Sequence, residues 1–241
     1  MAELVWISGA SGGIGRALVD SVPWPSARII GISRRRAPGT EHLAADLADP
    51  AAWDEVDASF RRELAGFGGD RVVFVHAAGT LEPMGFTGSV DTGAYSRNVV
   101  LNSAAPQVLG HMFLRAVAAL GGAQRHLVIL TSGAARSVYP GWSSYGAAKA
   151  AVDQWVRNVG AEQELRGGTQ VLAVAPGTVD TGMQELIRAT EADDFPQRQK
   201  FVDLHEAGRL TPPAEAAAKT WRLLDAGLDN GSVVDLRDQP G

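Results

Sequence analysis

Tyr145 and Lys149 are the two side chains whose types and spacing most directly suggest chemistry. They are four residues apart within a segment that is predicted to be helical over 143–166, so both project from one helix face. An ammonium group beside a phenol favours the tyrosinate and lowers the phenol pKa from its ordinary value of about 10. Proton donation by Tyr145 would then be useful near neutral pH, although the same spacing also arises by chance on helices.

A hydroxyl side chain stands at the end of a predicted strand upstream of this helix. Ser132 follows Thr131 and the apolar run Leu127–Leu130. The carboxyl ends of parallel strands are where open α/β sheets bind ligands. At that place Ser132 can hydrogen-bond a carbonyl oxygen and stabilise the negative charge that develops on it during reduction. Capping of the strand end is the alternative role.

A glycine-rich turn follows the first predicted strand, Leu4–Ile7. Gly9, Gly13 and Gly15 lie between this strand and a helix-compatible segment that begins at Arg16. Glycine backbone can approach a pyrophosphate closely at a helix N-terminus, where free N–H groups and the helix dipole favour negative charge. The turn is therefore a candidate nucleotide site, with a plain tight turn as the alternative.

Basic residues follow the second predicted strand, Ala27–Ile32. Arg34, Arg35 and Arg36 occupy the place where NAD-specific proteins usually carry an acidic residue against the ribose hydroxyls. The guanidinium groups of Arg34 and Arg35 can instead pair with a 2′-phosphate through bidentate, charge-assisted bonds. The sequence thus favours NADPH over NADH, with a solvated basic turn as the alternative.

The elements that must position these residues alternate along the chain. Short apolar runs separate longer stretches with helical spacing; they lie at 4–7, 27–32, 72–75, 127–130 and 171–175. Runs that are apolar at almost every position are typical of a parallel sheet covered by helices on both faces. We expect a Rossmann-like, doubly wound α/β fold that forms a single domain over 1–241. The polar segment 184–209 is expected to be a mobile substrate flap or an exposed helical excursion.

Composition excludes several other classes of protein. The 241 residues are 45% hydrophobic and 20% charged, as in ordinary globular proteins, and the net charge of −5 disfavours binding to nucleic acid or anionic lipid. The absence of Cys excludes disulfides, thiolate metal sites and Cys nucleophiles, and we expect no metal. No run approaches the roughly 20 apolar residues that span a bilayer, and Leu4–Ile7 favours a buried strand over a signal peptide. We expect a cytoplasmic protein.

Together the motifs resemble those of the classical short-chain dehydrogenase/reductase family over nearly the full chain. The turn resembles the family's T-G-x-x-x-G-x-G, with Ser8 in place of Thr, and Ser132 precedes Tyr145 by the family's catalytic interval. The resemblance implies that Tyr145 is the general acid and that Lys149 assists it. It further implies that Asn102 supports a water-mediated proton relay to the lysine, a role for which Asn98 competes.

The resemblance also implies where a cofactor lies. Asp46-Leu47 matches the acidic-apolar pair at the adenine ring, and 176–181 resembles the P-G-x-x-x-T segment that lines the nicotinamide pocket. His76-Ala77-Ala78-Gly79 replaces the usual N-N-A-G, so we interpret His76 as structural rather than catalytic. The implied cofactor-binding residues are Gly9, Ser11, Gly13, Ile14, Gly15, Arg34, Arg35, Asp46, Leu47, Ala78, Gly79, Tyr145, Lys149, Pro176, Gly177, Thr178, Val179 and Thr181.

Three features resemble the branch of the family that contains sepiapterin reductases and bacterial benzil reductases: Gly141-Trp142, Asp180–Gln184 and Gly231–Leu236. In sepiapterin reductases an Asp in the last segment anchors the pterin, and Asp235 corresponds to it. The implied substrate-binding residues are Ser132, Trp142, Tyr145, Gly177 and Asp235.

We therefore expect an NADPH-dependent reductase of a small-molecule ketone or vicinal dicarbonyl. A pterin reductase and a catalytically silent NADPH-binding sensor are the alternatives. By analogy with the subunit-contact helices of the family, the helical regions at 98–120 and 143–166 imply a homodimer or homotetramer.

Overall fold

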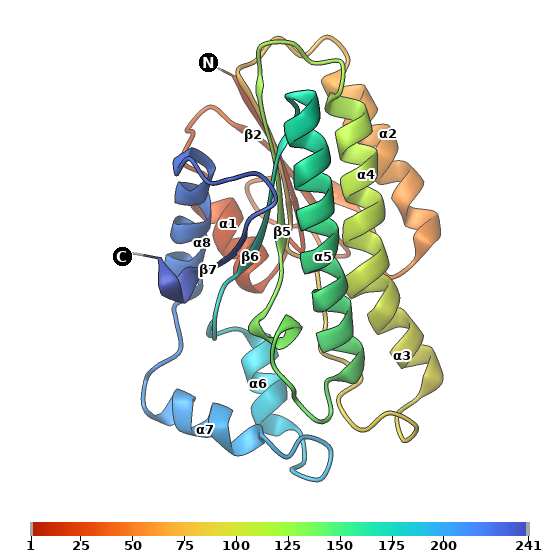
Figure 1. Cartoon of the computed structure of the whole chain (residues 1–241), viewed down its shortest axis with the longest axis vertical. Helices are drawn as coiled ribbons and strands as arrows, with labels where there is room; N and C mark the ends of the chain where they lie inside the picture. The colour runs from red at the N-terminus through yellow and green to blue at the C-terminus, as the bar shows by residue number, and fades with distance from the viewer. Residues whose placement is uncertain (1, 240–241) are drawn as a thin grey trace.

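A seven-stranded parallel sheet forms the centre of the computed structural model, which describes residues 2–239 (Figure 1). The strands lie in the order β3-β2-β1-β4-β5-β6-β7. Their bounds are β1 Glu3–Ser8, β2 Arg28–Ser33, β3 Glu41–Ala44, β4 Arg71–His76, β5 Gln124–Leu130, β6 Gln170–Ala175 and β7 Val233–Asp235. The strand order reverses between β1 and β4, and such a switch point opens a ligand-binding crevice at the carboxyl ends of the strands. The expected doubly wound fold is confirmed.

Helices cover both faces of this sheet. One face carries α1 (Gly13–Asp20) and α8 (Pro213–Arg222), whereas α2 (Trp53–Leu64), α4 (Ala105–Val117) and α5 (Ser143–Arg166) cover the other. α3 (Thr92–Val99) runs into α4 through a π-helical turn, Val100–Ala104. α6 (Gly182–Ala189) and α7 (Arg198–Glu206) lie beyond the carboxyl edge of the sheet (Figure 1). Among residues 2–239, no helix has the length and apolar character that crossing a membrane requires.

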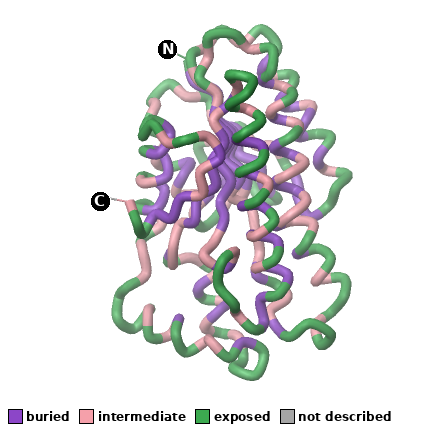
Figure 2. The backbone as a smooth tube through the Cα atoms, viewed as in Figure 1, coloured by how far each residue is buried: buried purple, intermediate pink, exposed green. Residues whose placement is uncertain are grey.

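Aromatic side chains fill the larger of the two cores, on the α2–α4–α5 face. Trp6, Phe60, Phe74 and Phe113 are fully buried, and their ring centroids lie 5.1–6.3 Å apart. The indole N–H of Trp6 donates to Ser59 Oγ at 3.2 Å, so its polar atom is satisfied within the core. Figure 2 shows that the buried part of the chain is concentrated in the sheet. This rigid layer holds the strand ends on which the candidate site is built.

Candidate active site

The glycine-rich turn packs directly on the end of β4. Gly9 has a φ of +69°, and a Cβ there would lie 2.9 Å from the backbone nitrogen of Ala78. A Cβ on Gly15 would lie 2.2 Å from the carbonyl oxygen of Gly9. Both positions therefore require glycine, and the turn brings bare backbone to the start of α1, whose first N–H groups no side chain caps.

Ser8 fixes this turn against the neighbouring strand. Its hydroxyl is fully buried and accepts hydrogen bonds from the backbone N–H groups of Ala77 and Ala78, at 3.0 and 3.1 Å. A hydroxyl side chain at this position therefore joins the ends of β1 and β4 at the switch point. Thr carries the same hydroxyl, which explains how Ser can replace it here.

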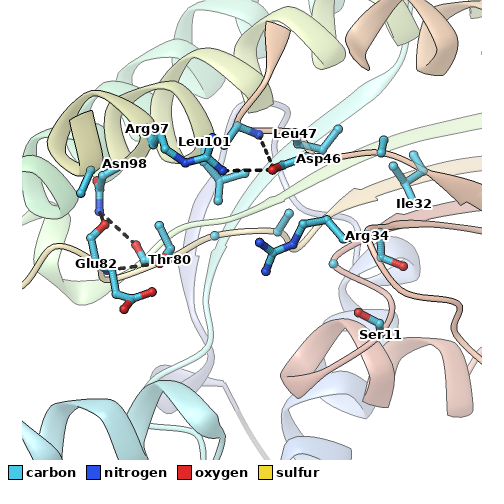
Figure 3. Close-up of a pocket in the computed structure, with 17 residues that line it drawn as sticks. Ser11, Ile32, Arg34, Asp46, Leu47, Thr80, Glu82, Arg97, Asn98 and Leu101 are labelled. Atoms are coloured by element: carbon cyan, nitrogen blue, oxygen red, sulfur yellow. Dashed lines mark hydrogen bonds and ion pairs between the residues drawn. The ribbon is translucent and has the colours of Figure 1, made fainter. Parts of the chain in front are cut away.

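A pocket of about 410 Å³ opens on one side of the turn (Figure 3). It is lined by Gly9, Ser11, Ile32, Ser33, Arg34, Ala45, Asp46, Leu47, Ala48, Ala78, Gly79, Thr80, Glu82, Ala94, Arg97, Asn98 and Leu101. Figure 3 shows the Arg34 guanidinium pointing into the space that these residues surround. Arg35 is exposed and does not line the pocket, so of the two predicted arginines only Arg34 faces it.

Asp46 is held at the edge of this pocket by two donors. Its carboxylate accepts the backbone N–H of Ala48 at 3.1 Å and pairs with Arg97 at 3.0 Å. Burial alone would raise the pKa of Asp46, but these two hydrogen bonds, together with the charges of Arg97 and Arg34, hold the pKa below its ordinary value. Sequence reasoning missed Arg97, because it lies on α3, some 50 residues from its partner, and belongs to no motif.

Ser132, Tyr145 and Lys149 come together at the carboxyl end of β5. Ser132 follows that strand directly, and its hydroxyl accepts the N–H of Ala134 at 3.1 Å and hydrogen-bonds with Tyr145. The Nζ atom of Lys149, whose residue is 4% exposed, donates to the carbonyl oxygen of Leu130 at 2.8 Å and lies 5.7 Å from the centroid of the Tyr145 ring. Ser132 can therefore cap the end of the strand and contact Tyr145 at the same time.

Burial dominates the electrostatics of this group. It raises the pKa of Tyr145, and the hydrogen bond to Ser132 opposes the rise. It lowers the pKa of Lys149 to about 8, against the charge of Asp153. The lowered tyrosine pKa expected from the sequence is thus not found in this geometry, because the ammonium group is directed to the Leu130 carbonyl and the phenol is desolvated. A neutral phenol beside a lysine that titrates near pH 8 is nevertheless arranged for proton donation.

Asn102 lies in the π-helical turn and holds the loop after β4. Its Nδ2 atom donates to the carbonyl oxygen of Thr80 at 2.8 Å and to Asn98 Oδ1 at 3.0 Å, and its Oδ1 atom accepts the N–H of Thr80 at 3.1 Å. A Cβ at Gly79 would lie 2.9 Å from Asn102 Oδ1 and 3.9 Å from Lys149 Nζ. Asn102 Oδ1 and Lys149 Nζ therefore both lie close to Gly79. Asn98 instead donates a hydrogen bond to the backbone carbonyl oxygen of Glu82.

His76 ends β4 in an apolar environment. It is 1% exposed, and neither ring nitrogen has a hydrogen-bond partner among residues 2–239. Burial, together with the charge of Lys149, lowers its pKa to about 3, so the ring is neutral near pH 7. Its ring packs edge-on against Phe74 with centroids 6.0 Å apart, which supports the structural interpretation.

A second pocket, of about 240 Å³, lies on the other side of the glycine turn and contains Ser132 and Tyr145. The predicted segment Pro176, Gly177, Thr178, Val179 and Thr181 lines it, as do Ile14 and Trp142. The Trp142 ring stacks on Phe195 with centroids 4.6 Å apart and meets the Tyr145 ring edge-on at 5.7 Å.

The segment 184–209 forms α7 and most of α6 and covers this second pocket. Three of its own side chains, Ile187, Phe195 and Phe201, are buried and pack with Trp142 in one cluster. The segment is helical, as one of the two alternatives expects, and its role as a mobile substrate flap stays a prediction. Its apolar side chains come from two helices and the loop between them, so no single period marks them in the sequence.

Asp235 lies behind the wall of the second pocket. The carboxylate is buried, and its two oxygens accept hydrogen bonds from Arg237 Nε and Nη2 at 2.9 and 2.6 Å. Arg237 lines the pocket, whereas Asp235 does not. The 3₁₀ turn at Leu236–Asp238 places Arg237 next to the carboxylate, so that Arg237 and not Asp235 faces the pocket in this structure. A direct contact between Asp235 and a substrate stays a prediction.

Known proteins are similar to this chain over most of its length. The family model described as short chain dehydrogenase matches residues 3–192. A benzil reductase ((S)-benzoin forming) of Bacillus subtilis is 30% identical over 241 residues, which cover 98% of this chain and 99% of the relative. A sepiapterin reductase of Rattus norvegicus is 29% identical over 254 residues, which cover 96% of this chain and 95% of the relative.

Solved structures share the fold. A short-chain dehydrogenase/reductase from Saccharomyces cerevisiae superposes with a TM-score of 0.83 at 24% identity, covering 98% of this chain and 96% of that one. An angucycline C-6 ketoreductase with bound NADP superposes with a TM-score of 0.77 at 23% identity, covering 97% and 93%. At these identities the structures establish the architecture alone.

Proposed function

Because this chain belongs to the short-chain dehydrogenase family, we propose that it is an NADPH-dependent carbonyl reductase acting on a ketone or vicinal dicarbonyl. The observation that carries the proposal is that Ser132 and Tyr145 line a pocket bordered by Ile14 of the glycine turn, while Gly9 and Ser11 of the same turn line the Arg34 pocket. One extended dinucleotide can occupy both pockets, with its pyrophosphate at the start of α1.

The residues present fit such a cofactor. Gly9 and Gly15 let the turn pack closely on β4 and on itself, where a Cβ would collide with backbone atoms. The N-cap of α1, Gly12, makes no side-chain cap hydrogen bond, so the first N–H groups of this helix are available to the pyrophosphate. Arg34 would pair with the 2′-phosphate, and the adenine would lie against Asp46-Leu47. The 176–181 segment would hold the nicotinamide end. When bound, NADPH supplies the hydride.

The protein's own groups manage the charge and the proton. The Ser132 hydroxyl donates a hydrogen bond to the substrate carbonyl oxygen, where negative charge develops. Tyr145 donates its phenolic proton to that oxygen, and burial keeps this proton in place until it is needed. Lys149 holds a proton near the phenol, and Asn102 fixes the loop at Gly79 beside it.

The aromatic lining favours an aryl dicarbonyl over a pterin. Trp142 and Phe201 give the pocket flat apolar surfaces next to Tyr145. The carboxylate of Asp235, which would bind the amino-pyrimidine edge of a pterin, is already engaged by Arg237. The benzil reductase relative supports the same choice.

A steady-state assay tests the proposal. Purified protein is mixed with NADPH or NADH and with benzil, sepiapterin or a simple aldehyde, and loss of absorbance of the reduced nicotinamide is followed. We expect oxidation of NADPH with benzil above the other two carbonyls. NADPH binding without turnover on any of these carbonyls would favour the sensor alternative.

Arg34→Ala is expected to change cofactor preference. Loss of a charge-assisted, bidentate contact with the 2′-phosphate lowers kcat/KM for NADPH about tenfold or more, because such bonds are worth about 1.5–3 kcal/mol. The value for NADH, which lacks this phosphate, stays within about twofold. Arg36→Ala is the matched control, since Arg36 is exposed and does not line the pocket. An equal loss with both cofactors would contradict the role of Arg34.

The rate of reduction is expected to depend on pH through Lys149. With a pKa of about 8, Lys149 carries its proton below pH 8 and loses it above, so kcat/KM for benzil falls as pH rises through about 8. The measurement is kcat/KM from pH 6 to 10 at saturating NADPH. Lys149→Met should remove this inflection from the remaining activity. A profile that stays flat to pH 10 in the wild type would exclude this role.

A further inference from the structure

The wall of the substrate pocket carries two cations. Lys200, from α7, and Arg237, from the turn after β7, both line the space that contains Ser132 and Tyr145. No Asp or Glu is among the described residues that line it. A neutral diketone has no group that makes use of two positive side chains, so these residues point to a feature of the substrate that the reaction itself does not require.

Lys200 forms no ion pair with an acidic side chain among residues 2–239. Its Nζ atom donates to the hydroxyl of Tyr139 at 2.9 Å and lies 5.1 and 5.6 Å from the ring centroids of Tyr139 and Phe201. Within the described part of the chain, no carboxylate forms an ion pair with it. Its charge is therefore held in position by aromatic rings and a phenol and remains available to an anion.

Arg237 is only partly neutralised. Arg237 shares the Asp235 carboxylate with Arg136, whose Nη2 atom lies 3.5 Å from Asp235 Oδ2. Arg237 also interacts electrostatically with the exposed Asp238. With Lys200 included, the cluster retains one excess positive charge, and both charged groups on the pocket wall itself are cations. The Arg237 side chain is 63% exposed, and its pairing with the buried Asp235 carboxylate holds it in one position.

The two cations lie within one substrate length of the reacting centre. A Cβ at Gly133, which follows Ser132 directly, would lie 3.6 Å from Arg237 Nη2. From Lys200, the rings of Tyr139, Trp142 and Tyr145 follow in sequence, with centroid separations of 4.8 and 5.7 Å. An aromatic body can therefore lie along these rings, with its carbonyl at Tyr145 and an anionic group at Lys200 and Arg237.

We propose that the substrate is an anionic carbonyl compound, namely an aryl ketone or dicarbonyl that carries a carboxylate at the end remote from the reduced carbonyl. The inference rests on the proposed reductase function and names the substrate class of the same pocket. Recognition comes from Lys200 and Arg237, and Tyr139 and Trp142 provide the surface between them and the reaction centre.

The test compares benzil-4-carboxylate with its methyl ester, which has the same dicarbonyl and nearly the same shape but no charge. We expect kcat/KM for the acid to exceed that for the ester about tenfold or more in the wild type, because charge-assisted bonds are the stronger ones. Lys200→Gln and, separately, Arg237→Gln should lower this acid-to-ester ratio severalfold. Lys219→Gln is the matched control, since it removes the same charge from an ion pair with Glu215 on α8.

The possible results separate failure of this inference from failure of the proposed reductase function. A wild-type ratio near one, or a ratio that Lys200→Gln leaves unchanged, overturns the inference, as does an equal fall in Lys219→Gln. Arg237→Gln leaves Asp235 with Arg136 alone and can unfold locally, but Lys200 has no such partner and keeps the test valid. If benzil and the ester are reduced without preference for the acid, only this inference fails. If none of the three is reduced, the reductase function itself fails.

Discussion

We expect Tyr145→Phe to lower kcat/KM for carbonyl reduction about a thousandfold, within the range of 10²–10⁴ typical of a positioned general acid. The substitution removes a single oxygen atom. The ring keeps its edge-on contact with Trp142, at 5.7 Å between centroids, and its place in the apolar cluster. The developing alkoxide then loses its proposed proton donor and keeps only the hydrogen bond from Ser132.

The control for this variant is binding. The dissociation constant for NADPH, measured by the fluorescence of the reduced nicotinamide, should change less than about threefold, because Phe preserves the shape of the pocket wall. Thermal unfolding should likewise be close to that of the wild type. Retention of more than a tenth of the wild-type kcat/KM would show that Tyr145 is not the proton donor.

The second large effect is expected for Lys149→Met. Loss of the ammonium group removes the protonated side chain beside Tyr145, so kcat/KM should fall about 10²–10³-fold. The free energy of unfolding at pH 7, by contrast, should fall by no more than about 1 kcal/mol. Burial of the charged lysine costs about 3 kcal/mol for a pKa lowered from 10.5 to about 8, and its removal offsets the loss of the hydrogen bond to Leu130.

The effect of Lys149 on how stability changes with pH can be measured. Between about pH 8 and 10.5 the unfolded chain binds more protons at Lys149 than the folded protein does, so this residue makes wild-type stability increase with pH across that window. Denaturant titrations at pH 7 and 10 should show the increase in the wild type and a smaller one in Lys149→Met. A variant that loses several kcal/mol at pH 7 would mean that Lys149 is chiefly a structural residue.

Local patterns were sufficient to predict most of the fold. The five apolar runs correspond to β1, β2, β4, β5 and β6, because the central positions of strands buried on both faces are almost all apolar. The helix predicted over 143–166 has those bounds, and Gly167 ends it with a φ of +58°. β3 was not predicted, since a four-residue edge strand with partly exposed positions has no continuous apolar pattern.

Part of the candidate site could likewise be predicted from the sequence, and part could not. Ser132, Tyr145 and Lys149 could be found because a strand end and one helix face fix their relation. The π-helical turn that presents Asn102 depends on a local shift of backbone hydrogen bonds that no residue type signals. The engagement of Asp235 by Arg237 and the position of Lys200 depend on tertiary contacts, and so the cationic wall was not predicted.

The most direct test of the central claim is a single-turnover experiment with NADPH deuterated at C4, in the stereoisomer that the protein oxidises, and with benzil. We predict one equivalent of benzoin carrying the deuterium at its carbinol carbon for each NADPH oxidised. Product formed without deuterium, or tight NADPH binding with no product from benzil or its carboxylate, would contradict the assignment of this pocket to hydride transfer onto a carbonyl.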